Sequence, residues 1–265
     1  MKPHQASQLA RVFLTGVFLV ALAGCACPTL PVAGAGRHIV LHAEPAADHD
    51  QLIAEADRTV ADVCAFLALP LPEHRAEARL FGSWWTRRRY LNHHCPALAH
   101  AGGVCFESEP GRFEIVLSER WRREETLRFL RHELCHYVIA SHFTQIPPWA
   151  DEGLATFFEK GAPYDRPRPE LLRSIVGDAE EDAAGVLRAL IVRPSGATLR
   201  SRDYALAWSL TRFLTIARAD GPDRFRQYLE NVRADRDAME QFTEVFGDFE
   251  RAAQAWARHV SEEAL

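Results

Sequence analysis

The sequence predicts an α+β protein with an N-terminal mixed β-sheet lobe and a helical C-terminal lobe. Between residues 37 and 117, short apolar runs typical of strands alternate with longer segments of helical periodicity. From Glu170 onward the apolar residues recur at helical spacing throughout. We therefore expect an N-terminal lobe over residues 37–145 and a helical lobe over residues 146–265, with a cleft shared between them.

The first 24 residues have the pattern of a bacterial export signal. Lys2 and Arg11 precede an apolar run over residues 12–23, which is too short to cross a bilayer as a mature helix. The run ends in Leu22-Ala23-Gly24-Cys25, which resembles the lipobox of bacterial lipoproteins and implies cleavage before Cys25 and its lipidation. We expect a lipid-anchored protein of the cell envelope, and Ala26 after the Cys favours the periplasmic face of the outer membrane. An ordinary secretory signal with an incidental Cys is the alternative.

The elements after the signal follow from composition and periodicity. Residues 25–36 show no core-forming pattern, so we expect a tether. The sheet lobe is expected to contain, in chain order, a strand at 37–42, a helix at 48–67, a strand at 78–81, a helix at 84–94, and a hairpin of strands at 104–107 and 112–117. In the helical lobe, breaks are expected at Gly177, Pro194-Ser195-Gly196 and Gly221-Pro222.

A helix is predicted from about residue 123 to 143, because this segment contains no Gly or Pro and is apolar on two sides. One side carries Leu127, Leu130, Leu134 and Val138, and the other carries Phe129, Ile139 and Phe143. Such a helix is expected to be buried between two layers of the fold.

The motif His132-Glu133-Leu134-Cys135-His136 lies on this helix. Residues four apart differ by about 40° around a helix axis, so both imidazoles project from one face and can bind one metal ion. Glu133 lies beside them and can act as a general base. Cys135 is expected to be a buried thiol, since adjacent helical residues do not converge on one point. The alternative is a pair of core histidines that are satisfied by backbone carbonyls.

Two residues are candidates for a third metal ligand. His142 has the H-E-x-x-H-x-x-x-x-x-H spacing, but the midway position holds Ile139 in place of a Gly. If the helix continues, His142 points about 240° away from His136. Glu152 follows Pro147-Pro148, which ends the helix and opens a second one. A carboxylate at that distance completes a His-His-Glu zinc site with an open fourth position, so Glu152 is preferred.

These two segments together resemble the gluzincin metallopeptidases, in particular the bacterial peptidase MA-like proteins. The likeness covers about residues 127 to 160 and pairs the H-E-x-x-H motif with Pro148-Trp149-Ala150-Asp151-Glu152-Gly153-Leu154-Ala155. It implies a zincin-like fold and a zinc peptidase, with Zn²⁺ held by His132, His136 and Glu152 and with Glu133 as the base. Asp151 stands where aminopeptidase-type relatives usually have Asn.

The resemblance also implies two features of the substrate site. Gluzincins often stabilise the oxyanion with a Tyr or His from the second lobe, and Tyr204 is the candidate here, with Tyr164 as its competitor. Zincins commonly align an extended substrate on the edge strand before the active-site helix, so Phe113 to Leu117 is expected to be that edge.

Charge and cysteine content limit the partners. A formal net charge of −5 argues against binding of nucleic acid as the main task, and we expect a peptide or protein substrate. Two other functions stay open: a lipid-anchored binding or scaffolding module on the same fold, and a zinc hydrolase of non-peptide amides. Export makes a disulfide possible, and Cys95 and Cys105, which flank a Gly-containing loop, are the expected pair.

Overall fold

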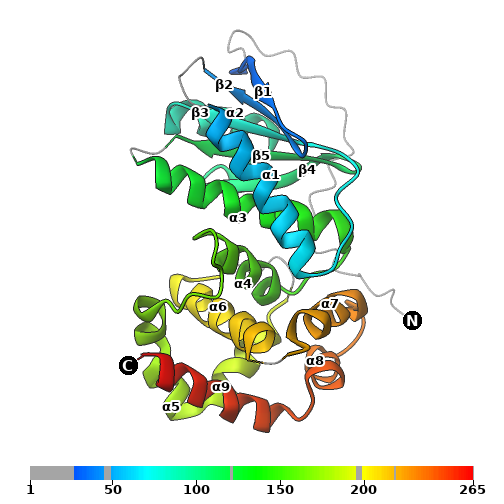
Figure 1. The fold of residues 1–265 in the computed structure, drawn as a ribbon, viewed down its shortest axis with the longest axis vertical. Helices are drawn as coiled ribbons and strands as arrows, with labels where there is room; N and C mark the ends of the chain where they lie inside the picture. The colour runs from blue at the N-terminus through cyan, green and yellow to red at the C-terminus, as the bar shows by residue number, and fades with distance from the viewer. Residues whose placement is uncertain (1–26, 45–48, 120–121, 195–198, 218, 265) are drawn as a thin grey trace, which may run out of the picture.

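The computed structural model describes residues 27–44, 49–119, 122–194, 199–217 and 219–264. Within them the chain forms a five-stranded mixed sheet followed by a helical region, as expected from the sequence (Figure 1). The strands are β1 (Val32–Ala35), β2 (Ile39–Ala43), β3 (Ala76–Phe81), β4 (Gly103–Glu109) and β5 (Arg112–Ser118). Their order in the sheet is β1-β2-β3-β5-β4, with the three inner strands parallel and the two outer strands antiparallel to their neighbours.

Helices cover both faces of the sheet. The helices are α1 (His49–Phe66), α2 (Trp84–His94), α3 (Arg123–His142), α4 (Pro148–Phe158), α5 (Pro169–Ile191), α6 (Ser201–Ile216), α7 (Gly221–Asn231), α8 (Ala238–Phe246) and α9 (Phe249–Ala264). Helix α2 covers one face, and α1 and α3 lie side by side on the other (Figure 1). Helix α4 packs on the side of α3 away from the sheet, and α5 to α9 extend beyond it.

The alternation along β5 shows how the sheet separates two cores. Ile115 and Leu117 are buried in the large core that also contains α1 and α3. Val116 faces the opposite way and joins the smaller core under α2. The predicted two-sided burial of α3 is confirmed, because Leu134 on one side and Ile139 on the other are both 0% exposed.

The expectation that Phe113 to Leu117 form a free edge is wrong. That segment is β5, which pairs with β3 on one side and with β4 on the other. Because the β4–β5 hairpin places its first strand outermost, β4 forms the end of the sheet. The chain order of the two strands was right, but their order in space was not.

The predicted tether also needs a correction. Residues 32–35 form β1, which pairs with β2 through backbone hydrogen bonds. This strand buries little, with Val32 63% exposed, so it lacks the apolar alternation by which a strand is recognised in sequence. The predicted signal peptide over residues 1–24 and Cys25 lie outside the described residues. Among the helices described, none combines the length and the apolar character that crossing a membrane requires.

Cys95 and Cys105 do not form the expected disulfide; both are free thiols. Cys95 is buried in the small core under α2, whereas Cys105 packs against the large core on the other side of the sheet. Neighbouring Val104 and Phe106 point to the α2 side, so Cys105 must point away from it. Two thiols on opposite faces of a sheet cannot be bridged without moving the strand.

Gly153 and Gly177 are both helical, yet their surroundings differ. A Cβ at Gly153 would lie 2.2 Å from Thr211 Oγ1 and 2.6 Å from the backbone oxygen of Ala207 on α6. Helices α4 and α6 therefore approach closely at the residue that follows Glu152. Gly177, an expected break, lies instead inside α5, and a Cβ there would meet nothing within 4 Å.

We predict that Gly153→Ala lowers the free energy of unfolding by about 1–3 kcal/mol, because the added methyl group overpacks the α4–α6 contact. The matched substitution Gly177→Ala should raise it by about 0.5–1 kcal/mol through helix propensity. Urea denaturation of both variants measures the difference. An unchanged or higher stability for Gly153→Ala would contradict the close packing of these helices.

Candidate metal centre

His132, His136 and Glu152 converge at the interface of α3 and α4. The two histidines project from the same face of α3, and Glu152 reaches them from the second turn of α4. Glu152 Oε2 lies 3.3 Å from His132 Nε2 and 3.6 Å from His136 Nε2. One donor atom from each of the three residues lies within 4.8 Å of the others. The separate segments of the sequence motif thus form one cluster of possible metal ligands.

Two further carboxylates contact the Nδ1 atoms of the histidine rings, whereas Glu152 faces their Nε2 atoms. Asp151 Oδ1 is 2.8 Å from His136 Nδ1, and Glu159 Oε2 is 3.5 Å from His132 Nδ1. The guanidinium of Arg168 in turn lies 2.9 Å from the other oxygen of Glu159. Both Nε2 atoms are therefore left to face Glu152. A histidine whose Nδ1–H is bonded to a carboxylate is the common arrangement around protein-bound metals, because the bond fixes the tautomer and the ring orientation.

Glu152 Oε2 is buried and has no hydrogen-bond partner among the described residues. Burial alone would raise the pKa of Glu152, but His136 and His132 outweigh it and hold the pKa well below its usual value. The charge of this buried oxygen is balanced by the two imidazoles, whose Nε2 atoms lie at 3.3 and 3.6 Å, or by a cation held among the three groups. The oxygen is thus placed to be a ligand.

The two imidazoles are in a site that favours positive charge. Burial lowers the pKa of His132, but Glu152 and Glu159 outweigh this and raise it to about 9. For His136, Asp151 and Glu152 likewise overcome the effect of burial, so its pKa lies well above the usual value. A surrounding of carboxylates that stabilises two imidazolium ions would equally stabilise one divalent cation.

Glu133 lies on the sheet side of this cluster and is 5% exposed. Burial raises its pKa, and His132 and His136 oppose that rise. A Cβ at Gly103, the first residue of β4, would lie 2.6 Å from Glu133 Oε1. The start of the outermost strand therefore runs directly beside the carboxylate, and a larger residue at position 103 would have to displace it.

The two tyrosine candidates lie in different places. The Tyr204 hydroxyl, near the start of α6, donates to Glu152 Oε1 at 3.4 Å. The Tyr164 hydroxyl donates to Asp62 Oδ2 at 2.5 Å and contacts none of the three clustered residues. Burial, followed by the charge of Glu152, raises the pKa of Tyr204, so its hydroxyl keeps its proton at neutral pH. Tyr204 is the tyrosine that reaches the site.

His142 and Cys135 are not part of the cluster. Helix α3 continues through Ile139 to His142, as the sequence predicts, and this carries His142 away to the backbone of Pro70. Cys135 is 0% exposed and packs in the large core, and burial raises the pKa of its thiol well above the usual value. These positions are the ones expected from the sequence, which favoured Glu152 over His142 as the third ligand and Cys135 as a buried thiol.

Sequence reasoning missed the roles of Asp151, Glu159 and Gly103. A signal for Glu159 was present, because it follows Glu152 by seven residues, or about two helical turns, and so lies on the same side at the end of α4. Asp151 was noted only as a departure from a family pattern. Gly103 had no signal in the sequence, since its approach to Glu133 depends on the pairing of β4 outside β5.

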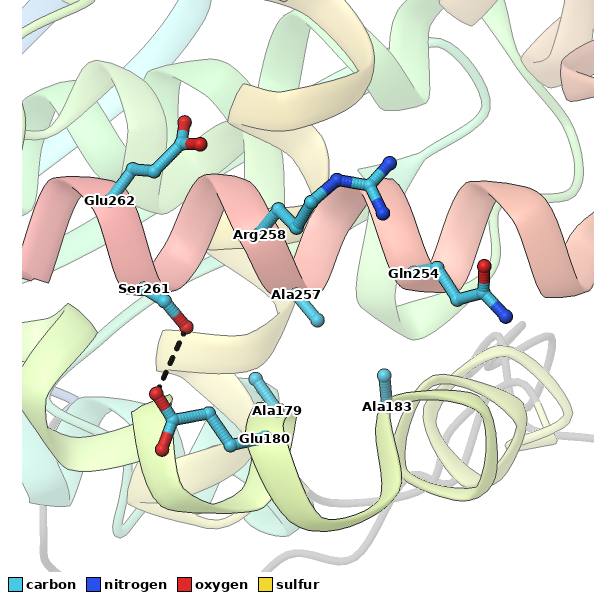
Figure 2. Close-up of a pocket in the computed structure, with 8 residues that line it drawn as sticks. All are labelled: Ala179, Glu180, Ala183, Gln254, Ala257, Arg258, Ser261 and Glu262. Atoms are coloured by element: carbon cyan, nitrogen blue, oxygen red, sulfur yellow. Dashed lines mark hydrogen bonds between the residues drawn. The ribbon is translucent and has the colours of Figure 1, made fainter.

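The described residues also form a shallow groove between α5 and α9, remote in sequence from the cluster (Figure 2). It is lined by small side chains, among them Ala179, Ala183 and Ala257, together with longer polar ones, and a hydrogen bond from Ser261 to Glu180 crosses it. None of the clustered ligands, Glu133 or Tyr204 contributes to it. The groove is therefore separate from the candidate metal centre.

Comparison of the chain with models of known protein families finds no match, and a search of curated proteins finds none either.

Proposed function

We propose that this protein is a zinc-dependent peptidase of the gluzincin type with a zincin-like fold, and that it hydrolyses peptide bonds with Glu133 as the general base. The observation that carries the proposal is the convergence of His132, His136 and Glu152, with Glu133 buried beside them. A binding module has no chemical need for a buried base next to a complete ligand set.

The ligand set fits zinc. Two imidazole nitrogens and one carboxylate oxygen are the protein ligands of catalytic sites that keep one position open. The fit is supported by the buried Glu152 oxygen that has no hydrogen bond among the described residues, and by the carboxylates behind each imidazole. When bound there, zinc would supply Lewis acidity, which polarises a carbonyl and lowers the pKa of water.

Glu133 is suited to accept and return a proton. Its pKa is raised by burial, which brings a carboxylate closer to the neutral pH at which general acid–base catalysis is most effective. In the proposed reaction the carboxylate takes the proton of the attacking water and delivers it to the nitrogen of the leaving amine. The position of Tyr204 beside Glu152 suits a hydroxyl that donates to the oxyanion formed from the scissile carbonyl.

The outer strand β4 is the surface best placed to align a substrate. It ends the sheet formed by the described residues and has no strand partner on its outer side there, so this edge suits pairing with an extended peptide. Its first residue, Gly103, lies against Glu133, so a peptide added at this edge would pass beside the base. Peptide or protein substrates are therefore the proposed class, and a lipid anchor at Cys25 would hold the enzyme at the bacterial cell envelope.

We predict that Glu133→Gln lowers peptide hydrolysis by about 10²–10⁴-fold, because the amide cannot accept a proton. Zinc content should be unchanged, since Glu133 is not in the ligand set. The experiment compares turnover of a peptide library by the parent, by Glu133→Gln and by Glu125→Gln, an exposed control on the same helix. Full activity in Glu133→Gln would show that Glu133 is not the general base. A parent that binds a partner without hydrolysis, equally with and without Glu133→Gln, would favour the scaffolding module.

Tyr204→Phe is predicted to lower kcat by about 10²–10³-fold with little change in KM, as expected for the loss of an oxyanion donor. Tyr164→Phe, which removes a hydroxyl of the same kind bonded to Asp62, is the matched control and should leave kcat unchanged. Steady-state kinetics on one peptide tests both. Equal kcat values for the two variants would show that the Tyr204 hydroxyl does not stabilise the oxyanion.

A further inference from the structure

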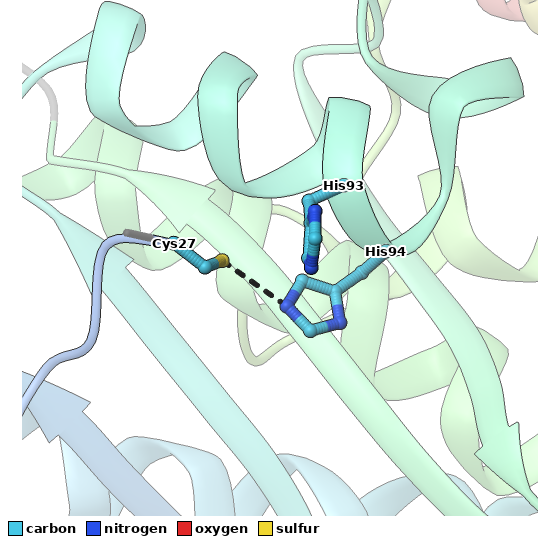
Figure 3. A group of neighbouring side chains, drawn as sticks. All are labelled: Cys27, His93 and His94. Atoms are coloured by element: carbon cyan, nitrogen blue, oxygen red, sulfur yellow. Dashed lines mark hydrogen bonds between the residues drawn. The ribbon is translucent and has the colours of Figure 1, made fainter. Parts of the chain in front are cut away.

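A second group of side chains with the donor atoms of metal ligands lies on the α2 side of the sheet (Figure 3). It consists of Cys27, from the segment before β1, and of His93 and His94, from the last turn of α2. Although the two histidines are adjacent in sequence, their long side chains bring the rings together edge to face at the end of the helix, with centroids 5.1 Å apart. Cys27 Sγ is 3.2 Å from His94 Nε2, and one donor atom from each residue lies within 4.8 Å of the others. None of these three residues belongs to the first cluster of His132, His136 and Glu152.

The surrounding contacts orient this group. The His94 ring stacks on Tyr90, with ring centroids 4.2 Å apart, and so turns toward Cys27. The Tyr90 hydroxyl is held in turn by Glu114 on β5, at 2.6 Å. Both histidines lie at the C-terminal end of α2, where the helix dipole favours a cation. Cys27 is half-buried against the small core, whereas the histidines are exposed, so the cluster is open to solvent on one side.

We propose that Cys27, His93 and His94 form a second zinc site, with a water molecule as the fourth ligand. One thiolate and two imidazoles are donors that zinc prefers, and three protein ligands leave one tetrahedral position for water.

Such a site would join parts of the chain that are 67 residues apart, namely the N-terminal segment and the end of α2. Cys27 is also two residues after Cys25, the predicted lipidation site. The bound ion would therefore fix the chain to the folded lobe at the point where the membrane anchor leaves it.

Cobalt(II) as a probe for zinc separates the two sites. The site of His132, His136 and Glu152 contains no sulfur, so a sulfur-to-cobalt charge-transfer band in the near-ultraviolet would report on the second site alone. We expect the full-length lipidated protein in detergent, stripped and reloaded with Co²⁺, to show this band. Cys27→Ser should abolish it, and His94→Ala, which leaves the signal region intact, should weaken Co²⁺ binding at least about tenfold. Glu152→Ala should retain it.

Cys105→Ser is the matched control, because among the described residues Cys105 is the other partly exposed thiol, and it lies on the opposite face of the sheet. The band should persist in this variant. Absence of the band from the folded parent, its persistence in Cys27→Ser, or its loss in Cys105→Ser would each overturn the second site. None of these results would bear on the first site, whose metal content is changed by Glu152→Ala.

Discussion

The structure depends on the burial of a charged cluster between α3 and α4. Glu152 faces two imidazoles, and Asp151 and Glu159 bond those rings from behind. Charged groups that are removed from water need a partner of opposite charge nearby, so the position of each carboxylate and imidazole depends on that of its neighbour. These contacts join α4 to α3 at the boundary between the sheet region and the helical region.

Packing on both sides of the cluster keeps it in place. The apolar sides of α3 anchor the histidines to the sheet, and the close contact of Gly153 with α6 brings Glu152 toward them. Tyr204 arrives with α6 and meets the same carboxylate. On the sheet side, Gly103 lets β4 reach Glu133. The carboxylate of Glu152, Glu133, the Tyr204 hydroxyl and the start of β4 thus come together around α3.

Helical periodicity predicted α3 and the common face of its two histidines, and the proline pair with the following carboxylate predicted the position of Glu152. These features depend on residues that are close together in the chain, so the spacing of residue types in the sequence predicts them. The position of β4 outside β5, and the separation of Cys95 from Cys105 by the sheet, depend on how strands pair in space. Strand β1 was missed because it is held by backbone hydrogen bonds and buries little. The bonds of Asp151 and Glu159 to the imidazoles required the relative placement of α3 and α4.

The most direct test of the account is the zinc content of the purified protein, measured by elemental analysis in a Cys27→Ser background so that only the first cluster contributes. We expect about one zinc ion per chain, lost in Glu152→Ala and kept in His142→Ala. A correctly folded protein without zinc, or one that loses zinc in His142→Ala but not in Glu152→Ala, would contradict it.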